Sequence, residues 1–374
     1  MAEQLQGGSD AEFAGIWIQH SPSFKLVIAF TKPSESKLSG LTIDPGVRSI
    51  IELRALPKPW RTLLAEQDRI IALLPRTIPY VSYVEPETGR LVVRVETEAL
   101  VQQVKTLLAT PGLPAVAVVL GPVPDHVAAP QGVQPGDYID GGHHYYGTNQ
   151  LPAGLTTAQE EQYRGCTFAF PARLGTTQGI LTAGHCNPGS PSGTSGTGYW
   201  HSINGHWVQL PVPTIARWAY GTKYDYQFHE TTGYDSPVAF VYYVNKSAEP
   251  NFYPSGHLSV KGTLGYNGQT AGMMACKSGW RTGVTCAKIR NGAYTYNGAR
   301  GWIELYRASG PHLAKPGDSG GAVFSPADTG ANVTAYGIAT AADSYSDGSS
   351  VFVYSPIDYI DDEQPIMVVL NTDY

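Results

Sequence analysis

The sequence predicts an α+β region followed by an all-β domain, and three observations support this division. All four cysteines lie after residue 165 of the 374-residue chain. Apolar residues at helical spacing occur twice before residue 130 and are scarce after residue 143. A proline-rich stretch, residues 121–142, contains few residues fit for a core and is typical of an exposed linker. We therefore expect one domain at 1–130 and a second at 131–374.

The first region mixes strands and helices. Its strand-like runs are 15–20, 25–31, the two arms of a hairpin within 80–96, and 115–121. Two runs, 59–74 and 98–110, carry apolar side chains at helical spacing. This region contains no cysteine and no convincing catalytic pair.

The second region consists of short apolar runs between Gly, Ser, Asn and Pro clusters. Examples are TFAFPARL, GILTAGH, YDYQFHE, PVAFVYYV and TAYGIATA. About a dozen such runs after residue 143 predict a β-sandwich or a barrel, or a pair of barrels.

Composition narrows the class of protein. Charged residues make up 15% of the chain, and Gly and Tyr are plentiful, which fits a secreted β-rich protein. No basic block interleaves with aromatic residues, so we expect no nucleic-acid partner. No apolar run approaches the length of about 20 residues that crosses a bilayer, so we expect no membrane span. The first residues lack the basic and apolar segments of a signal peptide, so we expect either that such a peptide is left out of this sequence or that export takes another route.

The four cysteines allow three disulfide pairings. Pairing Cys166 with Cys186 and Cys276 with Cys286 closes two modest loops, each worth about 3 kcal/mol in the chain-entropy model. A zinc site is the alternative, but no CxxC spacing occurs. We expect disulfides and no metal.

The run KPGDSGGAVF, residues 315–324, suits a nucleophile turn. Glycines beside Ser319 let backbone N–H groups converge on an oxyanion where side chains would block the substrate. A phosphate-binding loop is the rival interpretation, but GxxxxGK[ST] is absent.

A serine nucleophile needs a base, and the base needs an orienting carboxylate. His185, in GILTAGHC, ends an apolar strand at a turn that Cys186 could cross-link. Other candidate bases have less suitable contexts: His143, His144, His201, His206 and His229. Asp225 opens the run DYQFHE and is favoured as the carboxylate, with Asp235 as its rival.

TAGHC, an Asp that opens a strand, CKSGWRTGVTC and PGDSGG occur in that order. Over residues 138–374 the chain resembles the chymotrypsin-like serine peptidases, most closely the branch of the streptogrisins and α-lytic protease. The resemblance implies two perpendicular six-stranded antiparallel β-barrels with the active site between them. It also implies the two disulfides given above.

By motif matching, His185 is the general base, Asp225 orients it and Ser319 is the nucleophile. The N–H groups of Gly317 and Ser319 form the oxyanion hole. The resemblance further implies that a basic residue at Lys277 pairs with Asp318, where the branch more often carries Arg.

The resemblance makes residues 1–130 a propeptide that acts as an intramolecular chaperone and inhibitor and is then removed. An appended binding domain is the alternative.

The substrate-binding positions depart from the family pattern. Thr340, Ala341 and Ala342 stand where the family often has Ser-Gly-Gly. Leu313 matches the floor of the primary pocket and argues against selection of Lys or Arg, while Asp347 is expected to be a turn residue. We expect an apolar or small residue before the scissile bond.

The sequence thus predicts a secreted serine endopeptidase, made as a zymogen, that cleaves protein or peptide substrates without a cofactor. The alternatives are a catalytically inactive protease-like protein and a carbohydrate-binding protein.

Overall fold

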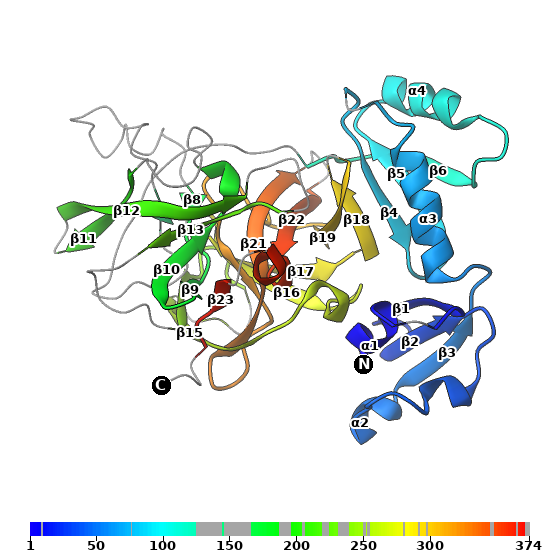
Figure 1. The fold of residues 1–374 in the computed structure, drawn as a ribbon, viewed down its shortest axis with the longest axis horizontal. Coiled ribbons are helices and arrows are strands. Elements are labelled where there is room, and N and C mark those ends of the chain that lie inside the picture. Colours follow the sequence, from blue (N-terminus) through cyan, green and yellow to red (C-terminus); the bar gives the residue numbers. More distant parts are fainter. Residues whose placement is uncertain are drawn as a thin grey trace. The chain divides into compact units, whose positions relative to one another are not determined.

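The computed structural model describes most of the chain, drawn in colour in Figure 1. The described residues are 1–8, 10–75, 77–124, 144–145, 166–186, 196–203, 206–218, 224–230, 239–249, 252, 255–279, 281–290, 292–296, 298–344, 348–363 and 366–370. None of the helices in these ranges has both the length and the apolar character that a membrane crossing needs.

Contacts divide the chain into two compact units. Unit 1 comprises Met1–Val123, Gly265–Met273 and Lys288–Leu305. Unit 2 comprises Pro124–Leu264, Met274–Ala287 and Tyr306–Tyr374. The domain boundary expected at residue 130 lies outside the described residues. Gly265–Met273 and Lys288–Leu305 belong to the expected second domain, but they group with the N-terminal region in unit 1.

Unit 1 contains a three-stranded sheet near the N-terminus (Figure 1). β1 (Phe13–Gln19) pairs antiparallel with β2 (Lys25–Phe30), as the sequence predicts. β2 also pairs in parallel with β3 (Ile51–Ala55), which the sequence analysis missed. Short helices surround this sheet: α1 (Ala2–Gln6), η1 (Glu35–Leu38) and α2 (Pro45–Arg48).

The rest of unit 1 is a sheet with two helices. β4 (Val81–Glu85) and β5 (Arg90–Val95) form the predicted hairpin, and β5 pairs in parallel with β6 (Val116–Leu120). The predicted helices are α3 (Trp60–Ile71) and α4 (Glu98–Leu108).

β4 also pairs with a strand from far along the chain. Its partner is β18 (Gly292–Tyr296), which forms a hairpin with β19 (Ala299–Arg307). These strands lie side by side in Figure 1. The 3-10 helix η3 (Tyr266–Gly268) also belongs to this unit.

Unit 2 contains a closed six-stranded antiparallel barrel. In spatial order its strands are β11 (Gly196–Ile203), β12 (His206–Trp218), β13 (Tyr226–Glu230), β10 (Thr177–Thr182), β9 (Pro171–Leu174) and β23 (Ile366–Val368).

A second group of strands follows in unit 2. In spatial order its strands are β14 (Phe240–Val244), β15 (Ser255–Thr263), β21 (Asn332–Ser344), β20 (Ala322–Phe324), β16 (Met274–Gly279) and β17 (Gly283–Ile289). β22 (Ser350–Pro356) pairs with β21. β15 and β21 pair in parallel. Smaller elements are β7 (His144–Tyr145), β8 (Cys166–Thr167), η2 (Gly184–Cys186) and α6 (Asp358–Glu363). The predicted fold class, an α+β region followed by a double-barrel β-domain, is confirmed.

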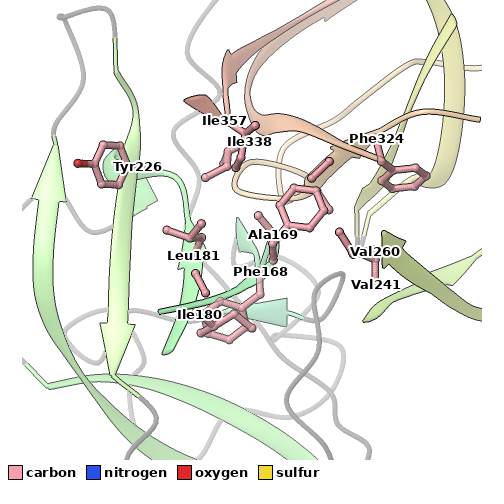
Figure 2. Close-up of a cluster of buried hydrophobic side chains, with 14 of the residues drawn as sticks. Phe168, Ala169, Ile180, Leu181, Tyr226, Val241, Val260, Phe324, Ile338 and Ile357 are labelled. Carbon is pink, nitrogen blue, oxygen red and sulfur yellow. The ribbon is translucent and has the colours of Figure 1, made fainter. Parts of the chain in front are cut away.

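One apolar core joins both groups of strands in unit 2. Figure 2 shows Phe168 and Leu181 near the barrel strands, and Phe324 and Ile338 from β20 and β21, in the same cluster. All four side chains are buried. Each such side chain contributes about 1.5–3 kcal/mol when it leaves water. The core includes residues of β10 and β20, the strands that lie beside the TAGHC and GDSGG motifs in the sequence.

Candidate active site

His185 lies in the 3-10 turn that follows β10. Cys186 is bonded to Cys166 with a Cα–Cα distance of 6.1 Å, and Cys186 N donates to Ala183 O at 3.2 Å. The disulfide and this turn bond fix the backbone on both sides of His185. The cysteine pairing that the sequence favoured is confirmed here.

Asp225 immediately precedes β13 and contacts His185 twice. Asp225 Oδ1 accepts from His185 N at 2.9 Å, and Asp225 Oδ2 lies 2.7 Å from His185 Nδ1. The carboxylate is fully buried and the imidazole is 6% exposed. Such a carboxylate fixes both the ring orientation and the tautomer that carries its proton on Nδ1. The rival, Asp235, lies outside the described residues.

Among the other histidine candidates, His229 is the one whose side chain the structure describes. His229 is a fully buried residue of β13, with its ring 6.3 Å from that of Phe168. His143 lies outside the described residues. Three others lie on strands: His144 on β7, His201 on β11 and His206 on β12.

Ser319 lies in a turn whose backbone requires glycine. Gly317 and Gly320 adopt φ angles of +107° and +83°, a region that side chains disfavour. Thr167 N donates to Ser319 O at 2.6 Å, and Thr167 Oγ1 donates to Gly317 O at 2.8 Å. Gly320 N donates to Ala339 O at 2.7 Å. The turn is therefore fixed by bonds to β8 and to β21.

The turn of Ser319 is packed against the residues that lead into His185. A Cβ atom on Gly320 would lie 2.1 Å from Thr182 Oγ1 and 3.0 Å from Ala183 N. Thr182 Oγ1 in turn donates to Thr167 O at 2.7 Å. Thr167 thus connects the two turns, although the sequence analysis did not single it out. No residue with a side chain fits at Gly320 without moving one turn from the other.

Asp318 is buried beside Ser319 and makes many hydrogen bonds. Its oxygens accept from four donors: Arg281 N at 2.8 Å, Thr282 N at 3.0 Å, Thr282 Oγ1 at 2.7 Å and Lys315 N at 2.8 Å. Gly279 is needed beside it, because a Cβ there would lie 2.3 Å from Asp318 Oδ1.

Lys277 supplies the cation for Asp318, as the resemblance implies. Its Nζ lies 3.4 Å from Asp318 Oδ2, donates to Gly283 O at 2.8 Å and contacts Thr282 Oγ1. Burial lowers the pKa of Lys277, and the charge of Asp318 opposes that shift. The adjacent disulfide Cys276–Cys286 closes the hairpin that carries Lys277 and Thr282.

The predicted substrate-binding residues are largely buried. Thr340, Ala341 and Ala342 lie on β21 immediately after Ala339, whose carbonyl binds the Ser319 turn. Leu313 is 1% exposed, and its carbonyl accepts from Thr285 Oγ1 at 2.6 Å. Asp347 lies outside the described residues.

One cluster of potential metal ligands lies at the site, formed by Cys166, His185 and Cys186. Because the two sulfurs are bonded to each other, neither offers the thiolate that zinc prefers. The described part of the chain thus explains this cluster as a disulfide beside an imidazole.

The chain is similar to several solved protease structures. Thermobifida fusca protease A is 21% identical with a TM-score of 0.41, covering 63% of this chain and 100% of that chain. Cellulomonas bogoriensis chymotrypsin is 22% identical with a TM-score of 0.42, covering 62% and 99%. An α-lytic protease homologue is 18% identical with a TM-score of 0.36, covering 54% and 92%. These are proteins of the class that the motifs predict. No family model and no curated protein matches the chain.

Proposed function

We propose that the chain is a secreted serine endopeptidase that hydrolyses peptide bonds through an acyl-enzyme. The observation that carries this proposal is the double contact of Asp225 with His185, next to a glycine-lined turn that contains Ser319. A buried carboxylate on Nδ1 leaves Nε2 of the imidazole to act on a hydroxyl. The two disulfides fit an oxidising compartment outside the cytosol.

In the proposed reaction, His185 Nε2 takes the proton of Ser319 Oγ as the oxygen attacks the carbonyl carbon of the substrate. Asp225 stabilises the imidazolium that forms. The N–H groups of Gly317 and Ser319 donate to the oxyanion, and losing one such donor costs on the order of 3 kcal/mol of transition-state stabilisation. His185 then protonates the leaving amine, and water attacks the acyl-enzyme by the same route.

We further propose that residues 1–130 are a propeptide that remains bound to the 288–305 segment after cleavage. Helix α3 contacts the β18–β19 hairpin through polar groups: Gln67 Nε2 donates to Ala293 O at 2.9 Å, and Arg300 Nη2 donates to Asp68 Oδ1 at 2.6 Å. Ala293 has a φ of +49°, an uncommon conformation that this contact stabilises. The β4–β18 pairing adds backbone hydrogen bonds.

A fluorophosphonate probe tests the catalytic proposal directly. We expect the probe to label Ser319, as read by mass spectrometry of the modified peptide, because only an activated hydroxyl attacks phosphorus rapidly. His185→Ala should abolish labelling, whereas His312→Ala should not, since His312 is exposed. Absence of labelling in correctly folded, propeptide-free protein would overturn the proposal and favour an inactive protease-like protein.

Digestion of a peptide library by the isolated protein tests the substrate class. We expect cleavage after small or apolar residues, since Leu313 stands at the expected pocket floor. Exclusive cleavage after Lys or Arg would contradict the proposed pocket. Sugar binding without any cleavage would favour the carbohydrate-binding alternative.

A further inference from the structure

Gln227 is a fully buried amide on β13, and no catalytic motif predicts it. It stands two residues after Asp225, so both side chains project from the same face of the strand. In the pairing of β10 with β13, Gln227 lies opposite Thr182, the last residue before the His185 turn. Gln227 is therefore placed beside the catalytic turn by the register of the barrel.

The amide of Gln227 binds the first residue of that turn. Gln227 Nε2 donates to Ala183 O at 2.8 Å. The same carbonyl also accepts from Cys186 N at 3.2 Å, so the side chain makes the shorter of its two hydrogen bonds. At the other end of the turn, His185 N donates to Asp225 Oδ1 at 2.9 Å. One strand face thus binds both ends of the segment 183–185.

Burying the Gln227 amide costs free energy unless its N–H group donates a hydrogen bond. Gln227 Oε1 is buried and has no hydrogen-bond partner within the described ranges. Leaving such an acceptor unsatisfied costs about 1–3 kcal/mol, and an apolar side chain of similar length avoids that cost. The N–H of Gln227 is the group that distinguishes it from Met at this position.

We propose that Gln227 is a positioning residue that fixes the Ala183–His185 turn, so that the imidazole keeps its Nδ1 on Asp225. This inference rests on the proposed serine-protease function. Without the donor, Ala183 O keeps only the longer bond from Cys186 N, and the turn can rotate relative to β13. Misplacement of a catalytic group by about 1 Å lowers the rate by up to about a hundredfold.

The test uses Gln227→Met, Gln227→Glu and the control Gln178→Met in the full chain. Gln178 lies on β10, four residues before Thr182 and away from the turn. For each isolated protein, kcat and KM are measured on a 4-nitrophenyl ester from acidic to neutral pH. We expect Gln227→Met to lower kcat about tenfold to a hundredfold with KM unchanged, and Gln178→Met to leave both unchanged.

Gln227→Glu separates hydrogen bonding from packing. A buried carboxylic acid that is still protonated can donate to Ala183 O, whereas its ionised form cannot. Relative to the unaltered chain at the same pH, we expect Gln227→Glu to gain activity as the pH falls, and Gln227→Met not to. Equal losses in both variants at every pH would show a packing role and overturn the inference. A kcat of Gln227→Met equal to that of Gln178→Met would also overturn it.

The low-field proton resonance of the His185 Nδ1–H provides a readout that needs no catalysis. We expect this resonance to broaden or shift in Gln227→Met and to remain unchanged in Gln178→Met. If the unaltered protein shows the resonance but is never labelled by the fluorophosphonate, the proposed function fails while the positioning role of Gln227 still stands. An unchanged resonance in Gln227→Met overturns the positioning role.

Discussion

Lys277 in unit 2 and Arg94 in unit 1 are both buried cations that face a buried carboxylate, but their hydrogen bonding differs. The three acceptors around Lys277 Nζ are Asp318 Oδ2, Gly283 O and Thr282 Oγ1, which match the three N–H groups of an ammonium. Arg94 contacts Glu304 through Nη2 alone. The Nε and Nη1 atoms of Arg94 are buried and have no hydrogen-bond partner within the described ranges.

The difference follows from where the partners lie in the sequence. Lys277 and Thr282 are on one disulfide-closed hairpin, so their positions are fixed locally. Arg94 and Glu304 are 210 residues apart, on opposite sides of the proposed cleavage site. Burial of Arg94 opposes its charge, while Glu304 raises its pKa. We expect the Lys277–Asp318 pair, whose hydrogen-bonding groups all have partners, to stabilise the active fold. We expect the Arg94–Glu304 pair, in which two guanidinium nitrogens lack hydrogen-bond partners within the described ranges, to form a contact that can separate.

Removing the buried ammonium group of Lys277 should lower the free energy of unfolding more than any other change proposed below. Lys277→Met removes the ammonium group that contacts the buried Asp318 carboxylate, which costs about 3–5 kcal/mol of unfolding free energy. Urea unfolding of the isolated protein measures this change. Lys261→Met, at an exposed position, is the control and should shift the midpoint little. An unchanged midpoint for Lys277→Met would mean that the four other hydrogen bonds of Asp318 suffice.

Removing Arg94 should lower the free energy of unfolding by a smaller amount, and removing its partner Glu304 as well should reverse that loss. Arg94→Met alone leaves Glu304 buried beside an apolar residue and should lower stability by about 2–3 kcal/mol. Arg94→Met combined with Glu304→Met should be neutral or stabilising, because two desolvation penalties disappear.

Resistance of residues 1–123 to proteolysis in a Ser319→Ala background, which prevents self-cleavage, measures both variants. Additive losses in the double variant would contradict this account of the pair.

The pH dependence should distinguish Lys277 from an arginine. Because burial lowers the pKa of Lys277, the folded protein loses this proton at a lower pH than the unfolded chain does. In the pH range between these two pKa values the unfolded chain binds more protons, so this group's contribution to unfolding free energy rises with pH. Activity should fall in the same window, because Lys277 no longer presents a positive charge to Asp318.

Lys277→Arg should move the alkaline fall in kcat to higher pH, since a guanidinium stays protonated. The pH profile of kcat for both proteins measures the shift. Coinciding alkaline limbs in the two profiles would show that another group causes the fall.

The exposed pair Glu85–Arg90 should show the smallest effect. Arg90 Nη2 lies 2.8 Å from Glu85 Oε1, but the Arg90 side chain is 54% exposed. Glu85→Gln should lower stability by less than about 1 kcal/mol, because water screens the pair. The same proteolysis assay measures it, with a loss above that of Arg94→Met as the result that contradicts the role of burial.

Much of the fold could be predicted from local patterns. The helix at 59–74 and the hairpin at 80–96 were predicted because periodicity and turn residues act over a few positions. β3 was missed, because its residues are only half-buried and its parallel pairing with β2 depends on distant backbone. β18 was missed for a similar reason: its register with β4 contains bulges that no alternation reveals.

The site divides in the same way. Motif matching predicted roles for His185 and Ser319 and the pairing of Lys277 with Asp318. The structure shows that ion pair and places His185 Nδ1 2.7 Å from Asp225 Oδ2. Thr167 and Gln227 carry no motif, because each acts through hydrogen bonds to backbone carbonyls of a distant turn. Such contacts depend on strand register, which the chain acquires only on folding.

The amino-acid sequence by itself determined the division into an α+β and a β-rich region, the disulfide-forming cysteines and the glycine-dependent turn around Ser319, because these depend on residue type and short spacing. The tertiary structure decided which carboxylate binds the imidazole and which threonine joins the two turns. It also decided that residues 288–305 pack with the N-terminal region. These outcomes depend on burial and hydrogen bonding between segments far apart in the chain, where the free energy of one contact depends on all the others that place it.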